Sequence, residues 1–182
     1  MASLVAPALL VHASFLAAMA EFQGEGRGAP DDRTGIGSEI RAYAGRWSTP
    51  DGFAVYVSDL RADALEETPR PPHIVPQTTL WWVDGHEYLG RVGIRHRLTE
   101  SLRLVGGHIG YDVRPSARRQ GHATAMLAAA LPVARALGIA SALLTCDSSN
   151  LASRRVIEAN GGMHIPATPG DGQTLRFWVP TG

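Results

Sequence analysis

The sequence contains no lysine, and it has only one cysteine, Cys146, among its 182 residues. A single thiol cannot form an intrachain disulfide and argues against a cysteine-based metal site, which favours a reducing cytoplasm. All 17 basic residues are arginines, a bias that we attribute to a GC-rich bacterial genome, and 17 acidic residues bring the formal net charge to zero. A neutral chain has no bulk field to draw it to nucleic acid or to an acidic membrane.

A long uninterrupted apolar run is also missing. The most apolar stretch, "MASLVAPALLVHASFLAAMAEF", is interrupted by Pro7 and His12, and no basic residue precedes Arg27. A secretory signal requires a basic start and an unbroken apolar core, and a membrane span requires about 20 apolar residues, so we expect neither. We predict a short strand over residues 3–6 and then an amphipathic helix, whose apolar residues recur at helical spacing: Phe15, Leu16, Met19 and Phe22.

The length and the composition, 45% apolar and 19% charged residues, are those of a single globular domain over residues 1–182. The predicted strands cover 78–85, 87–98, 106–113, 141–147 and 174–179, and the predicted helices cover 39–47, 121–137 and 150–160. Residues 24–38 have the composition of a loop, and residues 53–67 fit either a strand or a helix. An antiparallel meander followed by strand–helix–strand–helix order predicts an α+β fold with a mixed sheet.

The most informative stretch is "VRPSARRQGHAT", residues 113–124, where a predicted strand is followed by a predicted helix. The first N–H groups of a helix have no intrahelical partner and carry the positive end of the helix dipole, so they suit phosphate oxygens. Gly121 and Ala123 would allow close approach, and Arg118 and Arg119 would add charge-assisted hydrogen bonds. The stretch is neither a Walker loop nor a Rossmann fingerprint, because both glycine patterns are absent. The residues by themselves indicate an anion site or a plain loop.

The same stretch resembles the acetyl-CoA motif of the GNAT N-acetyltransferase superfamily, in which a valine ends the fourth strand and x-P-x-x-[RQ]-x-x-G-x-[GA] follows. The motif positions are occupied by Val113, Pro115, Arg118, Gly121 and Ala123. Downstream, "TCDSSNLASRRVIEANGG" resembles the fifth strand and its following helix, with Asn150 in the position that contacts the pantetheine arm. The resemblance is clear over residues 75–178 and looser over residues 1–74. "GGHIGYDVRPSARRQGHA" also resembles a bacterial group of predicted acetyltransferases, which brings no substrate with it.

This resemblance implies the GNAT fold: an α+β fold with a mixed, mostly antiparallel central sheet, splayed fourth and fifth strands, and helices on both faces. It implies acetyl-CoA as co-substrate, bound in the wedge between the splayed strands, and no metal. The residues implied to contact acetyl-CoA are Tyr111, Val113, Arg118, Arg119, Gly121, His122, Ala123, Thr124, Asn150 and Ser153.

The implied reaction is direct attack of a primary amine of a small molecule on the thioester, in a ternary complex. A protein or peptide amine is the alternative acceptor, and a non-catalytic acyl-CoA-binding module is the alternative class of function. Members of the superfamily commonly dimerise, so a homodimer is a further expectation of the resemblance.

The catalytic groups depart from the common pattern of the family. Many members place a tyrosine acid where this sequence has Ile157. Either another group protonates the departing thiolate or none is needed, because a thiol with a pKa of about 8.5 is a tolerable leaving group. Tyr111 and Cys146 are weak substitutes, and Cys146 is better explained as a small buried hydrophobe. His108 is our candidate general base, because it precedes the wedge and has a suitable intrinsic pKa, and a structural histidine is the alternative.

The acceptor site is expected outside the stretch from Tyr111 to Asn150, which acetyl-CoA would occupy. We expect the first helix, the loop at 24–38 and the strand with Trp81 and Trp82 to surround it, with one tryptophan in the core and the other a candidate to line the pocket. Acidic residues in and before the loop would attract an ammonium group: Glu21, Glu25, Asp31 and Asp32. The alternative is a solvated loop.

Overall fold

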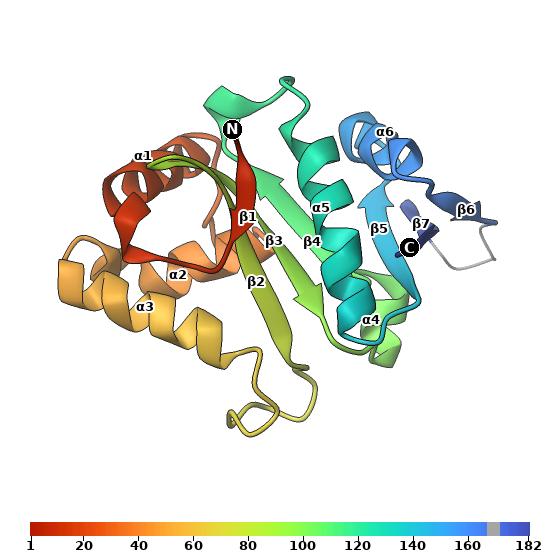
Figure 1. The fold of residues 1–182 in the computed structure, drawn as a ribbon, viewed down its shortest axis with the longest axis horizontal. Coiled ribbons are helices and arrows are strands. Elements are labelled where there is room, and N and C mark those ends of the chain that lie inside the picture. The colour runs from red at the N-terminus through yellow and green to blue at the C-terminus, as the bar shows by residue number, and fades with distance from the viewer. Residues whose placement is uncertain (167–171) are drawn as a thin grey trace.

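The computed structural model describes residues 1–166 and 172–182, and Figure 1 traces the chain. Its helices are α1 (His12–Gly24), α2 (Gly35–Trp47), α3 (Pro50–Ala62), α4 (Glu100–Leu104), α5 (His122–Ala136) and α6 (Leu151–Ala159), with 3-10 turns η1 (Leu9–Val11) and η2 (Pro115–Ala117). Its strands are β1 (Ser3–Val5), β2 (Gln77–Asp84), β3 (Glu87–Arg95), β4 (Ile109–Val113), β5 (Ser141–Asp147), β6 (Met163–Ile165) and β7 (Thr174–Pro180). Among the described residues, none of the helices has the length and hydropathy of a membrane span.

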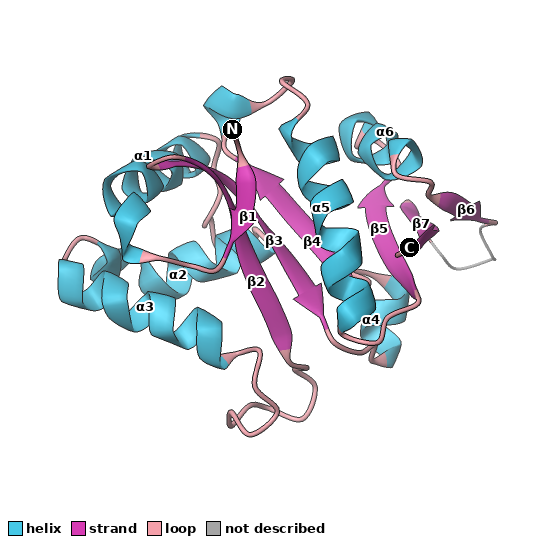
Figure 2. Cartoon of the chain, viewed as in Figure 1, coloured by secondary structure: helices cyan, strands magenta, loops and turns pink. Residues whose placement is uncertain are grey.

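The strands form two antiparallel sheets that lie side by side. The first has the order β1-β2-β3-β4, and the second has the order β5-β7-β6. The arrows of β4 and β5 point toward the same end of the molecule (Figure 2), so the junction between the sheets is where the arrangement becomes mixed. The α+β fold with a mostly antiparallel sheet is therefore confirmed.

Two hydrophobic cores cover opposite faces of the first sheet. One contains Met126 and Leu127 of α5 together with Val92 and Ile94 of β3, and it continues onto the second sheet. The other lies under α1, α2 and α3 and is built around aromatic rings. Helices thus cover both faces, and alternation along each strand decides which side chain enters which core.

The segment just before β4 touches β5, and the two strands separate beyond that contact. His108 N donates to Leu143 O at 2.7 Å, and Gly106 N donates to Thr145 Oγ1 at 2.8 Å. Gly107 permits this approach, because a Cβ there would lie 2.2 Å from Leu143 O. Beyond the contact, β4 pairs with β3 and β5 pairs with β7 in the described sheets. The resulting wedge opens toward the start of α5 and toward α6, as the predicted splay requires (Figure 1).

Several element boundaries differ from the expectation, for local reasons. The ambiguous segment is the helix α3, which begins at Pro50 behind the capping side chain of Thr49. The predicted loop is shorter than expected, because the Thr34 side chain accepts a hydrogen bond from Gly37 N and starts α2 at Gly35. The short elements α4 and β6 were not anticipated. Both are too short to show a hydrophobic period, so the sequence pattern carries little signal for them.

Candidate active site

The turn between β4 and α5 holds a run of backbone N–H groups without acceptors. From residue 119 to residue 124, none of them donates a hydrogen bond within the described part of the chain. The turn is shaped by two positive φ angles, 61° at Arg119 and 83° at Gly121. Glycine adopts this conformation without the steric cost that other residues bear. We call these N–H groups of residues 119–124 the cradle.

The first N–H groups of α5 are not capped by a side chain, unlike those of four other helices. Side chains of Thr34, Thr49, Thr99 and Asn150 cap α2, α3, α4 and α6. Gly121, at the same position of α5, supplies no side chain for this purpose. Unpaired N–H groups at the positive end of a helix dipole bind anions. The cradle therefore fits a diphosphate group held mainly by backbone.

The Arg118 side chain is paired with a carboxylate of the protein. Its guanidinium forms a two-point ion pair with Glu25 at the end of α1, at 2.7 and 2.8 Å, and its Nε donates to Val113 O at 3.1 Å. Arg119 makes no hydrogen bond or ion pair with a described residue. Both arginines are predicted to contact phosphate. The Arg118 side chain is paired with Glu25, whereas the Arg119 side chain has no partner among the described residues.

His122, the first residue of α5, is held by a tryptophan from the sheet. Trp82 Nε1 donates to His122 Nδ1 at 3.2 Å. With Nδ1 accepting, a neutral His122 carries its proton on Nε2 and can donate it elsewhere. Trp82 is 5% exposed and Trp81 is fully buried. One tryptophan was expected in the core and the other in an acceptor pocket. Both lie in the core, because α1 and α3 cover one ring and α5 covers the other.

The edge of β4 that faces the wedge offers free backbone groups. Arg95 N donates to His108 O, and Arg114 N donates to Leu89 O, so the even-numbered residues of this strand bond to β3. In an antiparallel ladder the intervening residues direct their N–H and C=O groups to the other side. Tyr111 and Val113 therefore present their N–H groups to the wedge.

Side chains from β4 and α6 meet across this wedge. The Tyr111 hydroxyl lies 2.8 Å from Ser153 Oγ, and burial raises the pKa of Tyr111 to about 12. Asn150 Oδ1 accepts from Ser153 N at 3.0 Å, which caps α6. Ile157, one turn further along α6, is 1% exposed and belongs to the core. The structure thus brings Tyr111, Asn150 and Ser153 together, and their contact with acetyl-CoA stays a prediction.

His108 lies at the closed end of the wedge. Its Nδ1 accepts a hydrogen bond from Leu143 N at 2.9 Å. Burial, together with the nearby Arg103 and Arg95, lowers the pKa of His108. The one free lone pair of a neutral imidazole is therefore engaged with the backbone of β5. His108 as the general base stays a prediction, with the added condition that this hydrogen bond must open first.

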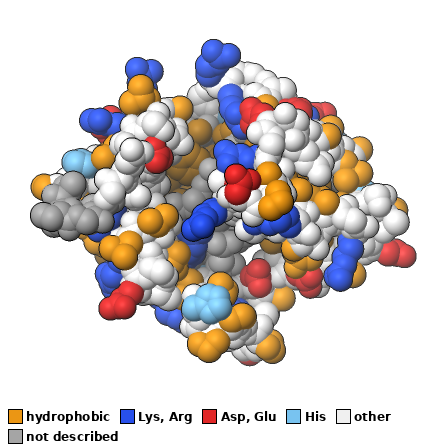
Figure 3. All heavy atoms as spheres, turned by 180° about the vertical axis from the view of Figure 1, so that it is seen from behind, with side chains coloured by type: hydrophobic (Ala, Val, Ile, Leu, Met, Phe, Trp, Pro, Cys, Tyr) orange, Lys and Arg blue, Asp and Glu red, His pale blue; other side chains and the backbone are white. Residues whose placement is uncertain are grey.

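A cavity of about 200 Å³ lies on the other face of the sheet, between α2 and the middle of β2, β3 and β4. Its floor is a row of small residues in register across three strands: Thr79, Gly93 and Gly110. We call it the sheet cavity. Figure 3, a view from behind Figure 1, shows the centre of that face hollowed, with basic and acidic side chains around the hollow.

An ion cluster forms one end of the sheet cavity. Arg91 Nε donates to Asp112 Oδ2 at 3.2 Å, and Arg91 Nη1 pairs with Glu39 Oε1. The other oxygen of Glu39 accepts from the Tyr56 hydroxyl at 2.6 Å. Burial by itself would lower the pKa of Arg91, but the two carboxylates hold it well above its usual value. The cluster is a fixed, charged wall.

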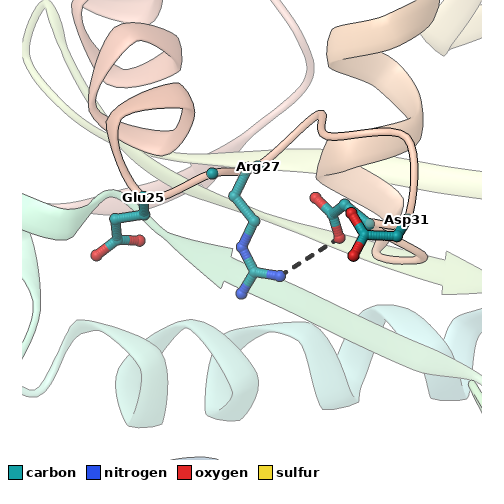
Figure 4. A pocket seen from close by; sticks show the side chains of 5 residues that line it. Glu25, Arg27 and Asp31 are labelled. Atoms are coloured by element: carbon teal, nitrogen blue, oxygen red, sulfur yellow. Dashed lines mark ion pairs between the residues drawn. The ribbon is translucent and has the colours of Figure 1, made fainter.

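The acidic loop surrounds a different space. Glu25, Arg27, Asp31 and Asp32 line an open hollow of about 480 Å³ (Figure 4). Burial would raise the pKa of Asp32, yet hydrogen bonds from Thr34 and Gly28 lower it to about 2. Asp32 thus serves the local turn and the start of α2. In the described structure the loop acids do not line the sheet cavity. From this part of the chain, only Gly35 and Glu39 line it among the described residues.

Residues 38–163 match the family described as "Acetyltransferase (GNAT) domain". The chain belongs to the GNAT acetyltransferase family. It is thus an enzyme that uses acetyl-CoA as acetyl donor, and the cradle and the wedge suit that co-substrate. A search of curated proteins finds no match. The described residues contain no group of three or more His, Cys, Asp or Glu side chains placed to hold a metal ion.

Solved GNAT structures share the fold at low sequence identity. Mycobacterium smegmatis RimJ, solved with CoA-disulfide, is 19% identical with a TM-score of 0.66, over 98% of this chain and 81% of that one. The microcin C7 self-immunity acetyltransferase MccE, solved with acetyl-CoA and AMP, is 11% identical with a TM-score of 0.63, over 98% and 92%. The PaiA N-acetyltransferase of Thermoplasma acidophilum, solved with coenzyme A, is 12% identical with a TM-score of 0.56, over 99% of both chains.

The sheet cavity contains residues that the sequence did not single out. Glu39, Arg91, Arg95 and Asp112 line the sheet cavity. The alternation along residues 87–98 places Arg91, Gly93 and Arg95 on one face, and that was the available signal. Cys146 is buried among core residues, and burial raises the pKa of its thiol, which agrees with the interpretation as a small hydrophobe.

Proposed function

We propose that this GNAT chain transfers the acetyl group of acetyl-CoA to the primary amine of a small molecule, by direct attack while both substrates are bound. The observation that carries the proposal is the position of the sheet cavity, which shares Gly110 and Tyr111 with the wedge-facing strand β4. An acceptor in that cavity would lie beside the strand along which the thioester is expected. Its volume of about 200 Å³ is below the roughly 300–1,000 Å³ of sites for drug-sized ligands, which favours a small acceptor.

The donor side follows from the free backbone groups. The cradle would receive the diphosphate, because its N–H groups have no other acceptor in the described chain. The pantetheine arm would pair with the wedge-facing groups of Tyr111 and Val113, as an added strand pairs with a sheet edge. The Tyr111 N–H would also polarise the thioester carbonyl. Arg119, His122 Nε2 and the amide nitrogen of Asn150 are the side-chain groups available beside this path.

The chemistry then depends mainly on positioning. A base takes one proton from the ammonium group, the amine nitrogen forms a bond to the carbonyl carbon, and the bond from that carbon to sulfur breaks. The products are the N-acetylated amine and the CoA thiolate, which receives the remaining amine proton directly or through water. Acetyl-CoA in the wedge and the acceptor in the sheet cavity would both be held against β4. This positioning converts a bimolecular step into a nearly unimolecular one. Asp112 has one carboxylate oxygen without a hydrogen bond from a described residue. It would hold the acceptor as an ammonium before deprotonation, for which His108 remains the residue predicted from the sequence.

The test measures thiol release from acetyl-CoA with a panel of small primary amines and, separately, with peptides that carry a free α-amine. A peptide panel is necessary because RimL, a similar solved structure, is described as a ribosomal L7/L12 α-N-protein acetyltransferase. We expect saturable turnover with small amines. Turnover with peptides alone would replace the proposed acceptor by a protein amine. Binding of acetyl-CoA without thiol release from any amine would indicate a non-catalytic module.

A further inference from the structure

The two ends of the sheet cavity carry opposite charge. At one end, the Arg91 cation is paired with two carboxylates, Glu39 and Asp112, which leaves one net negative charge. At the other end is Arg95, whose side chain forms no ion pair with a carboxylate in residues 1–166 or 172–182. Between them lies the glycine pair Gly93 and Gly110. A cavity with one negative and one positive end complements a zwitterion.

Arg95 is only partly satisfied where it stands. Its Nη1 donates to Gly106 O at 3.0 Å and to Gly107 O at 3.1 Å. Its Nε and Nη2 have no acceptor among the described residues. Burial and the repulsion of Arg91 lower the pKa of Arg95. A half-buried guanidinium without an anion is costly, and a carboxylate offers two oxygens to its remaining donors.

The negative end is arranged to receive a cation. Both oxygens of Glu39 are used, one by Arg91 and the other by the Tyr56 hydroxyl. Asp112 keeps one oxygen free of described partners. It stands two residues from Gly110 on β4, about 7 Å along the strand, and a Cβ on Gly110 would lie 3.9 Å from Arg95 Nη1. A short molecule can therefore span from Arg95 to Asp112 over the glycine floor.

We propose that the acceptor of this enzyme is a short amino acid or a similar carboxylate-bearing amine, with its carboxylate on Arg95 and its ammonium group beside Asp112. This inference rests on the proposed function, because it names the substrate class of the same site. It places the amine beside β4 between Gly110 and Asp112, near the expected thioester. Deprotonated there, the nitrogen attacks as described above, while the carboxylate stays on Arg95 and takes no part in the bonds that form and break.

The experiment compares amino acids with their carboxamides, which keep the amine and lose the negative charge. We expect kcat/KM for the acid to exceed that for the amide by about 10- to 100-fold, the size of a charge-assisted hydrogen-bonded pair. In Arg95→Gln, the preference should largely disappear, because the acid form loses rate and the amide form changes little. Arg97→Gln is the matched control: Arg97 lies just beyond β3, is exposed and pairs with Glu66 at 2.5 Å, so it should keep the preference.

The ratio of kcat/KM for the acid to kcat/KM for the amide distinguishes carboxylate binding by Arg95 from a structural role. If Arg95 only anchors the backbone of Gly106 and Gly107, the variant should lose the same factor with both forms, and that result would overturn the inference. Turnover of small amines without an acid preference in the wild type would overturn it and leave the proposed function intact. Absence of turnover with every small amine would overturn both. Acetyl-CoA affinity, measured by calorimetry, confirms that each variant is folded.

Discussion

His108 and Leu143 bind each other twice, through backbone and through side chain. His108 N donates to Leu143 O at 2.7 Å, and Leu143 N donates to His108 Nδ1 at 2.9 Å. These two hydrogen bonds tie the first sheet to the second at the closed end of the wedge. The position of β5 relative to β4, and so the width of the wedge, depends on a neutral His108.

The first prediction separates a positioning role for His108 from a role as general base. His108→Asn places an amide oxygen near the position of Nδ1, so it can still accept from Leu143 N, whereas His108→Ala cannot. If His108 only positions the wedge, His108→Asn should keep most of the acetyl-transfer rate, and His108→Ala should lose it together with thermal stability. A loss of about 10²-fold in both variants, diminishing at high pH, would instead establish His108 as the base. The pH profile of kcat/KM is the measurement.

The second prediction concerns the pH dependence of stability. Burial, with Arg103 and Arg95 nearby, lowers the pKa of His108, so the unfolded chain binds this proton more readily than the folded chain. The contribution of His108 is therefore complete above the unfolded value of about 6.5 and is lost as the pH falls below it. The free energy of unfolding of the wild type should fall more steeply between pH 7.5 and pH 5.5, roughly that window, than that of His108→Asn. Parallel curves from denaturant titrations would contradict this.

The third prediction tests the cradle at Gly121. A Cβ there meets no protein atom within 4 Å, but the φ of 83° disfavours most side chains. Gly121→Asn is the control, because asparagine tolerates this region and is neutral. Gly121→Asp should fold similarly and bind acetyl-CoA about 10²- to 10³-fold more weakly than Gly121→Asn, because its carboxylate would face the diphosphate. Equal affinities of the two variants in calorimetry would show that the diphosphate does not bind at this turn.

The fourth prediction concerns the ion pair between Arg118 and Glu25. Both side chains are about 40% exposed, so the pair contributes little stability. Glu25→Gln removes a carboxylate near the cradle and frees Arg118 for phosphate oxygens. We expect acetyl-CoA to bind a few-fold more tightly at low salt, with the gain lost at high salt. Weaker binding in this variant would mean that Glu25 holds Arg118 in its productive position.

The fifth prediction compares two buried tyrosines in the core that joins α1–α3 to the first sheet. The Tyr56 hydroxyl donates to Glu39 at 2.6 Å, whereas the fully buried Tyr88 hydroxyl has no partner in the described chain. Tyr56→Phe should lower the free energy of unfolding by about 1.5–3 kcal/mol, because the bond is to a charged group. Tyr88→Phe should leave it unchanged or raise it by up to about 1 kcal/mol. A large loss in Tyr88→Phe would point to an ordered partner of that hydroxyl.

The local geometry of the predicted donor side could be expected from the sequence because it depends on neighbours along the chain. Gly121 precedes α5, Asn150 caps α6, and alternation along β4 directs the Tyr111 side chain to the first core and the Asp112 side chain to Arg91. Each of these features is decided within a few residues by φ preference, capping chemistry or strand period. The family motif lies in the same stretch, and for that reason the predicted anion site falls within residues 113–124.

The sheet cavity, which is the proposed acceptor site, was decided only by tertiary structure. Glu39, Arg91 and Asp112 come from a helix and two strands, and their contacts depend on strand register and on how α2 packs against the sheet. The state of Arg95 is likewise a property of what lies around it, since an arginine on a strand can equally well be a solvated surface residue. Sequence periodicity says which face a side chain occupies, but partners far apart in the chain are fixed by packing and burial.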